Sequence, residues 1–241
     1  MNEIEIHNIT FSYDNETIFS NLSLSVTKGS IVSLIGNSGC GKSTLLNLIT
    51  GILKPMCGKI IINSDFSYLM QEPVLLSYKT ALENALFPCE LKGKKNKNTI
   101  SLAKDLLKTF KIEENSLLKF PHELSGGMKQ RIGIIQALLT NTPLLLFDEP
   151  FNAIDVNTIY TIGEYIWKYI KKEGKTLIFI THDFEQAINL SDNIIILNNV
   201  HSSQEIRFPT SFCKLPPNQR KNAIDHNKIW FEIISAMNHE V

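Results

Sequence analysis

The sequence predicts an α/β protein with a largely parallel central sheet and a helical lobe inserted into it. Apolar runs of strand length at 31–35, 144–147 and 176–180 are typical of strands buried on both faces of a parallel sheet. A glycine-rich loop at 36–44 lies between the first of these runs and a helical segment. The stretch from about 80 to 122 has no strand-like alternation, which indicates a helical insertion.

Length and composition limit the possible classes of protein. A chain of 241 residues fits one large domain or a domain with a lobe. The formal net charge is zero, so there is no electrostatic argument for a nucleic-acid partner. No apolar run approaches the length of a membrane span, and the N-terminus does not resemble a signal peptide. The four cysteines form no C-x-x-C pair, which favours a reducing cytosol without a disulfide framework or zinc site.

The N-terminal third is predicted to be mainly β. Polar and apolar residues alternate at 3–7 and 22–27, and Tyr13 lies between these two predicted strands. Tyr13 could stack on a nucleotide base or be an ordinary half-buried turn residue. Short strands are also expected at 59–62 and 66–70, followed by Gln71, which by itself is typical of solvated surface.

The glycine-rich loop fits the G-x-x-x-x-G-K-[ST] phosphate-loop pattern without a mismatch. It consists of Gly36, Asn37, Ser38, Gly39, Cys40, Gly41, Lys42, Ser43 and Thr44. Glycines let backbone N–H groups surround phosphate oxygens, and the following helix, at 45–49, adds its positive end. Lys42 would reach the β- and γ-phosphates, and Ser43 would hold Mg²⁺. The strand and helix on the correct sides favour this interpretation over a chance glycine-rich turn.

The predicted lobe contains at least two helices. Residues 80–83 form a capping-box pattern that begins one helix, and Leu102, Leu106 and Phe110 mark an amphipathic helix. Between them, the basic stretch 92–98 is interpreted as a solvated loop. We place the boundaries of the lobe at about 76–140 within a single domain of 1–241.

A helix is predicted to follow Ser125, whose hydroxyl could cap it. Gly126 and Gly127 would lie in its first turn, where glycine is costly. The loss of helix stability is explained if the backbone N–H groups of these glycines must approach an anion.

Polar side chains follow two buried strands. Asp148 and Glu149 come directly after 144–147, and His182 comes two residues after 176–180. Open α/β sheets bind ligands at the carboxyl ends of their strands, so these residues are candidates for the same site as the phosphate loop. Asp155 is predicted to begin a helix that ends at Gly174. A strand at 193–197 with a turn at 198–199, and a packing helix at 229–237, complete the prediction.

Together these motifs resemble the ATP-binding subunit of ABC transporters over about residues 4–197. The matches are Tyr13 (adenine-stacking aromatic), 36–44 (Walker A), Gln71 (Q-loop), 124–130 (signature motif), 144–149 (Walker B), Asp155 (D-loop) and His182 (switch histidine). The resemblance implies a P-loop NTPase fold with a RecA-like core, an antiparallel β subdomain and a helical subdomain. Three departures are visible: Asn152 replaces a usual serine, Gln136 replaces a common arginine, and 58–71 is short.

The resemblance also implies the roles of individual residues in an ATP- and Mg²⁺-dependent ATPase. Glu149, His182 and Lys42 would be catalytic, and Ser43, Gln71 and Asp148 would hold Mg²⁺. The nucleotide would be bound by Tyr13, the whole loop 36–44, Gln71, Ser125, Gly126, Gly127, Gln130 and Asp155. Ser125 and Gly127 would act on the nucleotide of a second copy, so that a head-to-tail dimer encloses two ATP molecules.

The expected partners are a second copy of the chain, integral membrane permease subunits and a solute-binding protein. The chain would then lie on the cytoplasmic, inner face of the cell membrane, attached through the permease. Within the family, residues 71–76 and 125–131 look most like importers of nitrate, sulfonates, taurine or thiamine precursors. An exporter ATPase and a soluble ATPase of an assembly scaffold, for example in iron–sulfur biogenesis, remain as alternatives. A DNA-maintenance or translation ATPase is disfavoured because the chain has neither a long coiled-coil insertion nor tandem cassettes.

Overall fold

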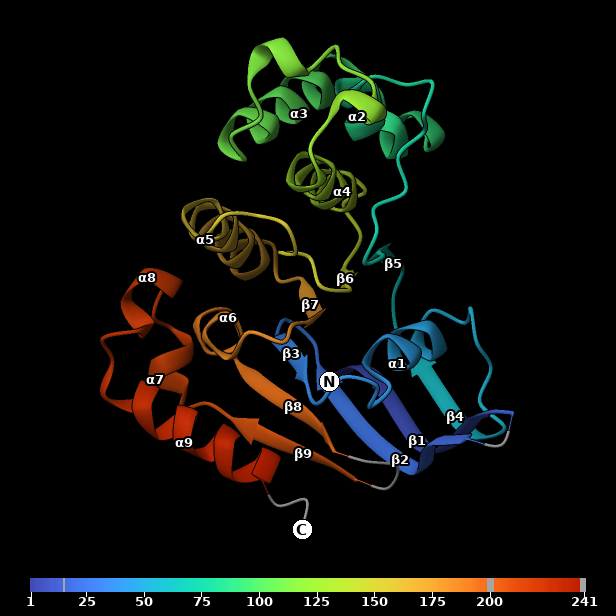
Figure 1. Cartoon of the computed structure of the whole chain (residues 1–241), viewed down its shortest axis with the longest axis vertical. Helices are drawn as coiled ribbons and strands as arrows, with labels where there is room; N and C mark the ends of the chain where they lie inside the picture. Colours follow the sequence, from blue (N-terminus) through green and yellow to red (C-terminus); the bar gives the residue numbers. More distant parts are fainter. Residues whose placement is uncertain (15, 199–201, 239–241) are drawn as a thin grey trace.

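Two sheets and a helical segment make up the architecture (Figure 1). The structure is a computed structural model that describes residues 1–14, 16–198 and 202–238. The central sheet has six strands in the order β5-β6-β7-β3-β8-β9. Their bounds are Phe66–Leu69, Leu144–Phe147, Thr176–Ile180, Ile31–Ile35, Asn193–Asn198 and Ser202–Arg207. The first five are parallel, and β9 pairs antiparallel with β8.

A smaller antiparallel sheet covers one face of the central sheet. It is formed by β1 (Asn2–Tyr13), β2 (Glu16–Thr27) and β4 (Cys57–Ile62), in the order β2-β1-β4. Helix α1 (Lys42–Ile49) packs with both sheets in one apolar cluster. Leu144 and Leu146 of β6 point into this cluster, because alternate residues of a strand face opposite sides of the sheet.

The other face of the central sheet is covered by helices α4 (Gly126–Leu139) and α5 (Val156–Glu173). Leu145 and Phe147 of β6 belong to this second cluster. Helices α2 (Ala81–Leu91) and α3 (Lys97–Thr109) pack on α4 and form the far end of the molecule in Figure 1. Two short 3₁₀ helices, Glu114–Ser116 and Pro121–Glu123, connect α3 to α4.

The C-terminal segment forms a third apolar cluster with β8. It contains α7 (Thr210–Cys213), α8 (Pro217–Arg220) and α9 (Ile224–Asn238), and α6 (Phe184–Leu190) packs with it. None of the helices in the described residues is long and apolar enough to cross a lipid bilayer.

The ends of several elements follow from local chemistry. Thr80 caps α2 in a full capping box with Glu83, as expected. Asp155 caps α5 by accepting from the Thr158 N–H at 3.0 Å, and Gly174 ends that helix in a left-handed conformation. These predictions were correct because caps are encoded within a few residues of the helix end.

Other local predictions were wrong. Tyr13 lies within β1 and not between strands, and Lys97 and Asn98 belong to α3 and not to the loop. Leu102 is 46% exposed, because the buried face of α3 is formed by Ala103, Leu106 and Leu107. Strand β9 and helices α7 and α8 were not predicted. Of the turn expected at 198–199, Asn198 belongs to β8, and 199 lies outside the described residues.

Candidate nucleotide site

The site is assembled where three neighbouring parallel strands end. In the sheet order, β6, β7 and β3 lie side by side. The phosphate loop follows β3, Asp148 and Glu149 follow β6, and His182 follows β7. Because parallel strands end at a common edge, three segments far apart in the sequence meet there.

Two glycines allow the phosphate loop to adopt its shape. Gly36 has φ 152°, and a Cβ atom at this position would lie 2.4 Å from the Leu197 carbonyl oxygen. Gly41 has φ 95°, and a Cβ atom there would lie 2.5 Å from Cγ2 of Ile18. Both positions therefore require glycine for conformation and for space. The close packing against β2 and β8 holds the loop in a defined position at the start of α1.

Lys42 lies across this loop. Its ammonium group donates hydrogen bonds of 2.8 Å to the carbonyl oxygens of Gly36 and Asn37. The Sγ atom of Cys40 lies 3.7 Å from the same nitrogen. The cation is thus held among the loop's own acceptors, where an incoming phosphate group would meet it.

Asp148 connects the β6 end of the site to the phosphate loop. Its carboxylate accepts a hydrogen bond from the Ser43 hydroxyl. The residue is 3% exposed, and its Oδ1 atom has no hydrogen-bond partner among the described residues. Burial raises the pKa of Asp148, the nearby Glu149 carboxylate raises it further, and the Ser43 hydrogen bond opposes the shift.

This carboxylate and hydroxyl fit Mg²⁺. The ion prefers oxygen donors and is often held by one or two carboxylates together with substrate phosphates and water. A buried carboxylate oxygen without a partner is suited to such a ligand. In the described part of the chain, no cluster of three or more His, Cys, Asp or Glu residues could hold a metal alone. Oxygen atoms of the nucleotide and of water would be among the remaining donors.

Glu149 is held in an unusual backbone conformation with φ 45°. Its carbonyl oxygen accepts a hydrogen bond of 3.3 Å from Nε2 of Gln130, a buried residue of α4. Its Oε2 atom accepts from the Asn152 side-chain amide and lies 3.6 Å from Nδ1 of His182. Left-handed non-glycine residues are strained and tend to occur at functional sites.

The signature residues form a separate group with the D-loop. A Cβ atom on Gly127 would lie 2.4 Å from the Ala153 carbonyl oxygen, so the start of α4 touches the segment before Asp155. The Ser125 hydroxyl accepts from the Met128 N–H at 3.3 Å. Hydrogen bonds from Thr158 lower the pKa of Asp155, and Lys111 lowers it further. The Ser125 hydroxyl and the Asp155 carboxylate thus both accept from the first turn of the helix that they begin.

Two predicted site residues lie at the periphery. Tyr13 is 46% exposed, and its ring meets that of Phe11 edge-on with centroids 4.9 Å apart. Gln71 follows β5 and is exposed, and its side chain has no hydrogen bond within the described part of the chain. Neither residue is bound to the phosphate loop in this arrangement.

Some contacts at the site were not foreseen from the sequence. Asn152 stood out only as a departure from the family pattern, yet it donates to the Glu149 carboxylate. The bond from Gln130, a residue assigned to the nucleotide, to the Glu149 backbone was also not foreseen. The Thr181 hydroxyl accepts from the Asp183 N–H at 3.1 Å and donates to Gln186 Oε1 at 2.8 Å, which shapes the segment around His182.

Comparison with known proteins identifies the family. Residues 19–152, more than half of the chain, match the family model described as "ABC transporter". The chain is 35% identical over 206 residues to the formylaminopyrimidine import ATP-binding protein ThiZ of Halalkalibacterium halodurans, covering 83% of this chain and 82% of that protein. It is 37% identical over 199 residues to the ergothioneine transport ATP-binding protein EgtV of Helicobacter pylori, with coverages of 78% and 93%.

A third relative is longer than this chain. The carnitine transport ATP-binding protein OpuCA of Listeria monocytogenes is 36% identical over 211 residues, which cover 81% of this chain. The matched region spans 53% of that protein, about half of its length.

Solved structures have the same fold. The dimeric post-hydrolysis state of the ATP-binding cassette MJ0796, bound to ADP and Pi, has a TM-score of 0.76 and 29% identity. The match covers 86% of this chain and 99% of that chain. The predicted P-loop NTPase fold is confirmed, and the chain belongs to the ABC transporter family as an ABC ATPase domain.

Proposed function

We propose that this chain is the ATP-hydrolysing subunit of an ABC importer, and that two copies act together beneath separate membrane permease subunits. The observation that carries the proposal is the meeting of the phosphate loop, Asp148 and the Glu149–His182 pair at one sheet edge. The names of the import and transport relatives support the role in transport.

The binding step uses the phosphate loop and the two acidic positions. Backbone N–H groups of 36–44 and the Lys42 ammonium would hold the β- and γ-phosphates. Ser43 and Asp148 would hold Mg²⁺, and Gln71 would complete this set of ligands after moving inward. When bound, Mg²⁺ neutralises charge on the phosphate oxygens. Tyr13 would stack on the adenine ring, because half of its surface is open to a partner.

The chemical step uses Glu149 as the general base. A water oxygen forms a bond to the γ-phosphorus, the bond from that phosphorus to the bridging oxygen of ADP breaks, and Glu149 accepts a proton from the water. His182, 3.6 Å from the same carboxylate, would contact the γ-phosphate. Asn152 donates to the carboxylate and therefore orients it, so its replacement of the usual serine keeps a hydrogen-bond donor there.

The signature residues lie apart from the phosphate loop, which supports the proposal that they contact the nucleotide bound by a second copy of the chain. Ser125 and Asp155 accept from their own helices, and Gly127 packs against Ala153, so these residues form a group of their own beside α4 and α5. In a head-to-tail pair they would face the nucleotide held by the partner. The relative solved as a dimer with ADP and Pi has the same fold, which supports this arrangement.

The membrane partner and the transported solute are also part of the proposal. The names of the transport relatives favour a separate membrane permease as partner, with the chain at the cytoplasmic face beneath it. The relatives' names include a formylaminopyrimidine import ATP-binding protein and an ergothioneine transport ATP-binding protein. We propose import of a small solute delivered by a solute-binding protein, of the nitrate, sulfonate, taurine or thiamine-precursor type.

ATP hydrolysis by the purified chain is the primary test. With Mg²⁺ and ATP, the chain should release phosphate, and the Glu149→Gln variant should release far less. Equal rates in the two proteins would contradict the assignment of the base.

Two further experiments test the transport role. Co-purification with a multi-span membrane protein would favour a transporter subunit over a scaffold ATPase. The direction of solute movement in vesicles would distinguish import from export.

A further inference from the structure

A cavity lies between α5 on one side and helices α2, α3 and α4 on the other. Its volume is about 590 Å³. It is lined by residues of α2, α3 and the end of α4 on one side and by residues of α5 on the other. None of the lining residues belongs to the phosphate loop, the signature motif or the segments around Glu149 and His182. The cavity is therefore distinct from the candidate nucleotide site.

The floor of the cavity is apolar and aromatic. Leu106 and Leu138 are buried in it, and Leu102 is 46% exposed beside them. The rings of Tyr165 and Tyr169 are stacked, with centroids 6.4 Å apart and an interplanar angle of 13°.

Hydrogen bonding holds this floor rigid. The single proton of the Tyr169 hydroxyl is shared between two acceptors, the Leu138 carbonyl oxygen at 3.4 Å and Asn141 Oδ1 at 3.2 Å. A rigid apolar surface of this kind binds an apolar or aromatic body at a low entropic cost.

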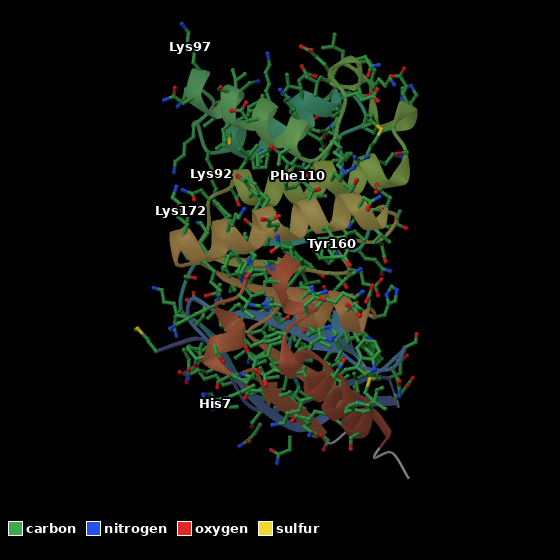
Figure 2. The ribbon with its side chains drawn as sticks, turned by 90° about the vertical axis from the view of Figure 1, so that its left-hand side faces the viewer. His7, Lys92, Lys97, Phe110, Tyr160 and Lys172 are labelled. Carbon is green, nitrogen blue, oxygen red and sulfur yellow. The ribbon has the colours of Figure 1, made fainter. Side chains whose placement is uncertain are left out.

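The rim of the cavity is basic. Lys92 and Lys94 approach from the loop after α2, and Lys168 and Lys172 approach from α5, against one acidic lining residue, Glu173. Figure 2 shows Lys92 and Lys172 near each other at one edge of the molecule. The whole chain has a net charge of zero, so this concentration of positive charge is local.

These lysines are only partly neutralised. Lys168 pairs with Glu164 at 2.7 Å, whereas Lys172 lies 4.0 Å from Glu173. The Lys92 ammonium donates to a backbone carbonyl, that of Thr140, at 3.3 Å. Lys94 forms no ion pair among the described residues.

The positive field reaches the cavity wall. The lysines Lys92 and Lys94 both lower the pKa of Cys89, against the larger effect of burial, which raises it. Because Lys168 and Lys172 line the opposite side of the cavity, an anionic group between the two pairs of lysines would be attracted from both sides.

We propose that this cavity binds a small amphipathic anion: an apolar or aromatic body lies on Tyr165, Tyr169 and Leu102, and its carboxylate, phosphate or sulfonate lies between Lys92 and Lys172. The volume lies in the range of about 300–1,000 Å³ that is usual for small-molecule sites. Its open mouth and basic rim suit a ligand that keeps its charged end near solvent. The occupant contacts both the helical segment and α5, so binding should resist their separation.

The test is a fluorescence titration of the full chain with 8-anilinonaphthalene-1-sulfonate, in the presence of excess ATP and Mg²⁺. The double variant Lys92→Gln/Lys172→Gln should bind the probe roughly fivefold to tenfold more weakly, since two nearby charges are removed. Leu102→Glu should also weaken binding, because it places a negative charge on an exposed helical position at the mouth. The matched control Lys54→Gln/Lys59→Gln removes two exposed lysines from outside the cavity and should leave the dissociation constant unchanged.

Three outcomes would overturn the proposal. Equal dissociation constants in the cavity variants and the control would indicate general adsorption of the dye. Binding of the probe only in a parallel titration without ATP, with no effect of the cavity variants, would place it at the phosphate loop. The third outcome combines two results: the chain does not bind the free probe, and it sediments with phosphatidylglycerol vesicles only when Lys92 and Lys172 are present. This outcome would assign the lysines to a membrane surface. Circular dichroism spectra matching the parent would show that each variant is folded.

Discussion

The Nδ1 atom of His182 lies 3.6 Å from the Oε2 atom of Glu149, although the two residues follow different strands, β7 and β6. The Glu149 carboxylate also accepts from the Asn152 amide, and the Glu149 backbone is held by Gln130. The carboxylate is thus positioned from three segments of the chain. Such over-determination is needed to hold a base in place at the edge of a sheet.

We expect Glu149→Gln to bind ATP and dimerise but to hydrolyse ATP about 10²–10⁴-fold more slowly, the usual contribution of a general base. Glutamine keeps the size and can hydrogen-bond to water, but it cannot accept a proton. Each ATP would then stay between Lys42 of one copy and Ser125 of the other. Size-exclusion chromatography with ATP and Mg²⁺ should show a dimer for the variant and mostly monomer for the parent.

The exposed Glu232→Gln variant on α9 serves as the matched control and should behave like the parent. A Glu149→Gln protein that binds ATP tightly yet stays monomeric would argue against a shared site.

We expect Lys42→Ala to lose about 10²–10³-fold in ATP hydrolysis, the usual effect of removing one group that stabilises transition-state charge. The ammonium lies against the loop carbonyls of Gly36 and Asn37, where it would meet the γ-phosphate. Phosphate release and calorimetric binding of ATP would measure the loss, with exposed Lys54→Ala as the control. Parent-like turnover in Lys42→Ala would remove the loop from the proposed site.

We expect Asp148→Asn to have opposite effects on stability and on binding. Without ATP and Mg²⁺, the free energy of unfolding should rise by about 1 kcal/mol, because a buried carboxylate with a raised pKa is replaced by a neutral amide. The gain in ATP affinity that Mg²⁺ provides should be lost, because the amide carries no charge. Urea unfolding and calorimetry would measure the two effects. A stability loss of several kcal/mol would show that the charged form is needed for folding.

We expect the surface around Tyr78 to contact a membrane partner. Tyr78 is 71% exposed, and Val74, nearby in the same segment before α2, is 69% exposed. Exposed apolar residues in a cluster often mark an interface. A cysteine at Tyr78, in a Cys57→Ser background that removes the exposed native thiol, should cross-link to a co-expressed permease.

Phe231→Cys in the same background is the matched control, because Phe231 is 70% exposed but belongs to α9. Cross-links from Tyr78→Cys only within the chain, or equal cross-linking from both positions, would count against a specific contact.

We expect Arg220→Ala to destabilise the chain by about 3–5 kcal/mol, the range for breaking a buried charged network. Arg220 is fully buried, and its guanidinium donates to the carbonyl oxygens of Ile188 at 3.2 Å and Cys213 at 3.1 Å. It also donates to Ser191 and Leu215, and thereby ties the C-terminal segment to α6.

Urea unfolding would measure the cost of Arg220→Ala. Its neighbour Lys221 is largely exposed, so Lys221→Ala should change stability by no more than about 0.5 kcal/mol. Similar small effects in both variants would mean that the C-terminal helices contribute little to the stability of the core.

The fold was largely predictable because its signals are local. Buried parallel strands such as β6 and β7 appear as continuous apolar runs, and the helix beginnings at Thr80, Ser125 and Asp155 carry their own capping residues. Strand β9 was missed because Ser203, Gln204 and Glu205 carry no apolar run, and the strand forms by pairing with β8. Helices α7 and α8 are four residues each, too short for a periodic pattern.

By itself, the sequence determined the chemistry that is available: a phosphate loop, two acidic residues after one strand, and a histidine after another. These are statements about short segments, and the strand order of an α/β sheet brings such segments to one edge. Only the tertiary structure decided which atoms meet: Ser43 with Asp148, Gln130 with the Glu149 backbone, and Asn152 with its carboxylate. It also placed the lysines at 92 and 172 around one cavity. Such contacts depend on how helices pack on the sheet, and residues distant in the sequence do not encode that packing in any local pattern.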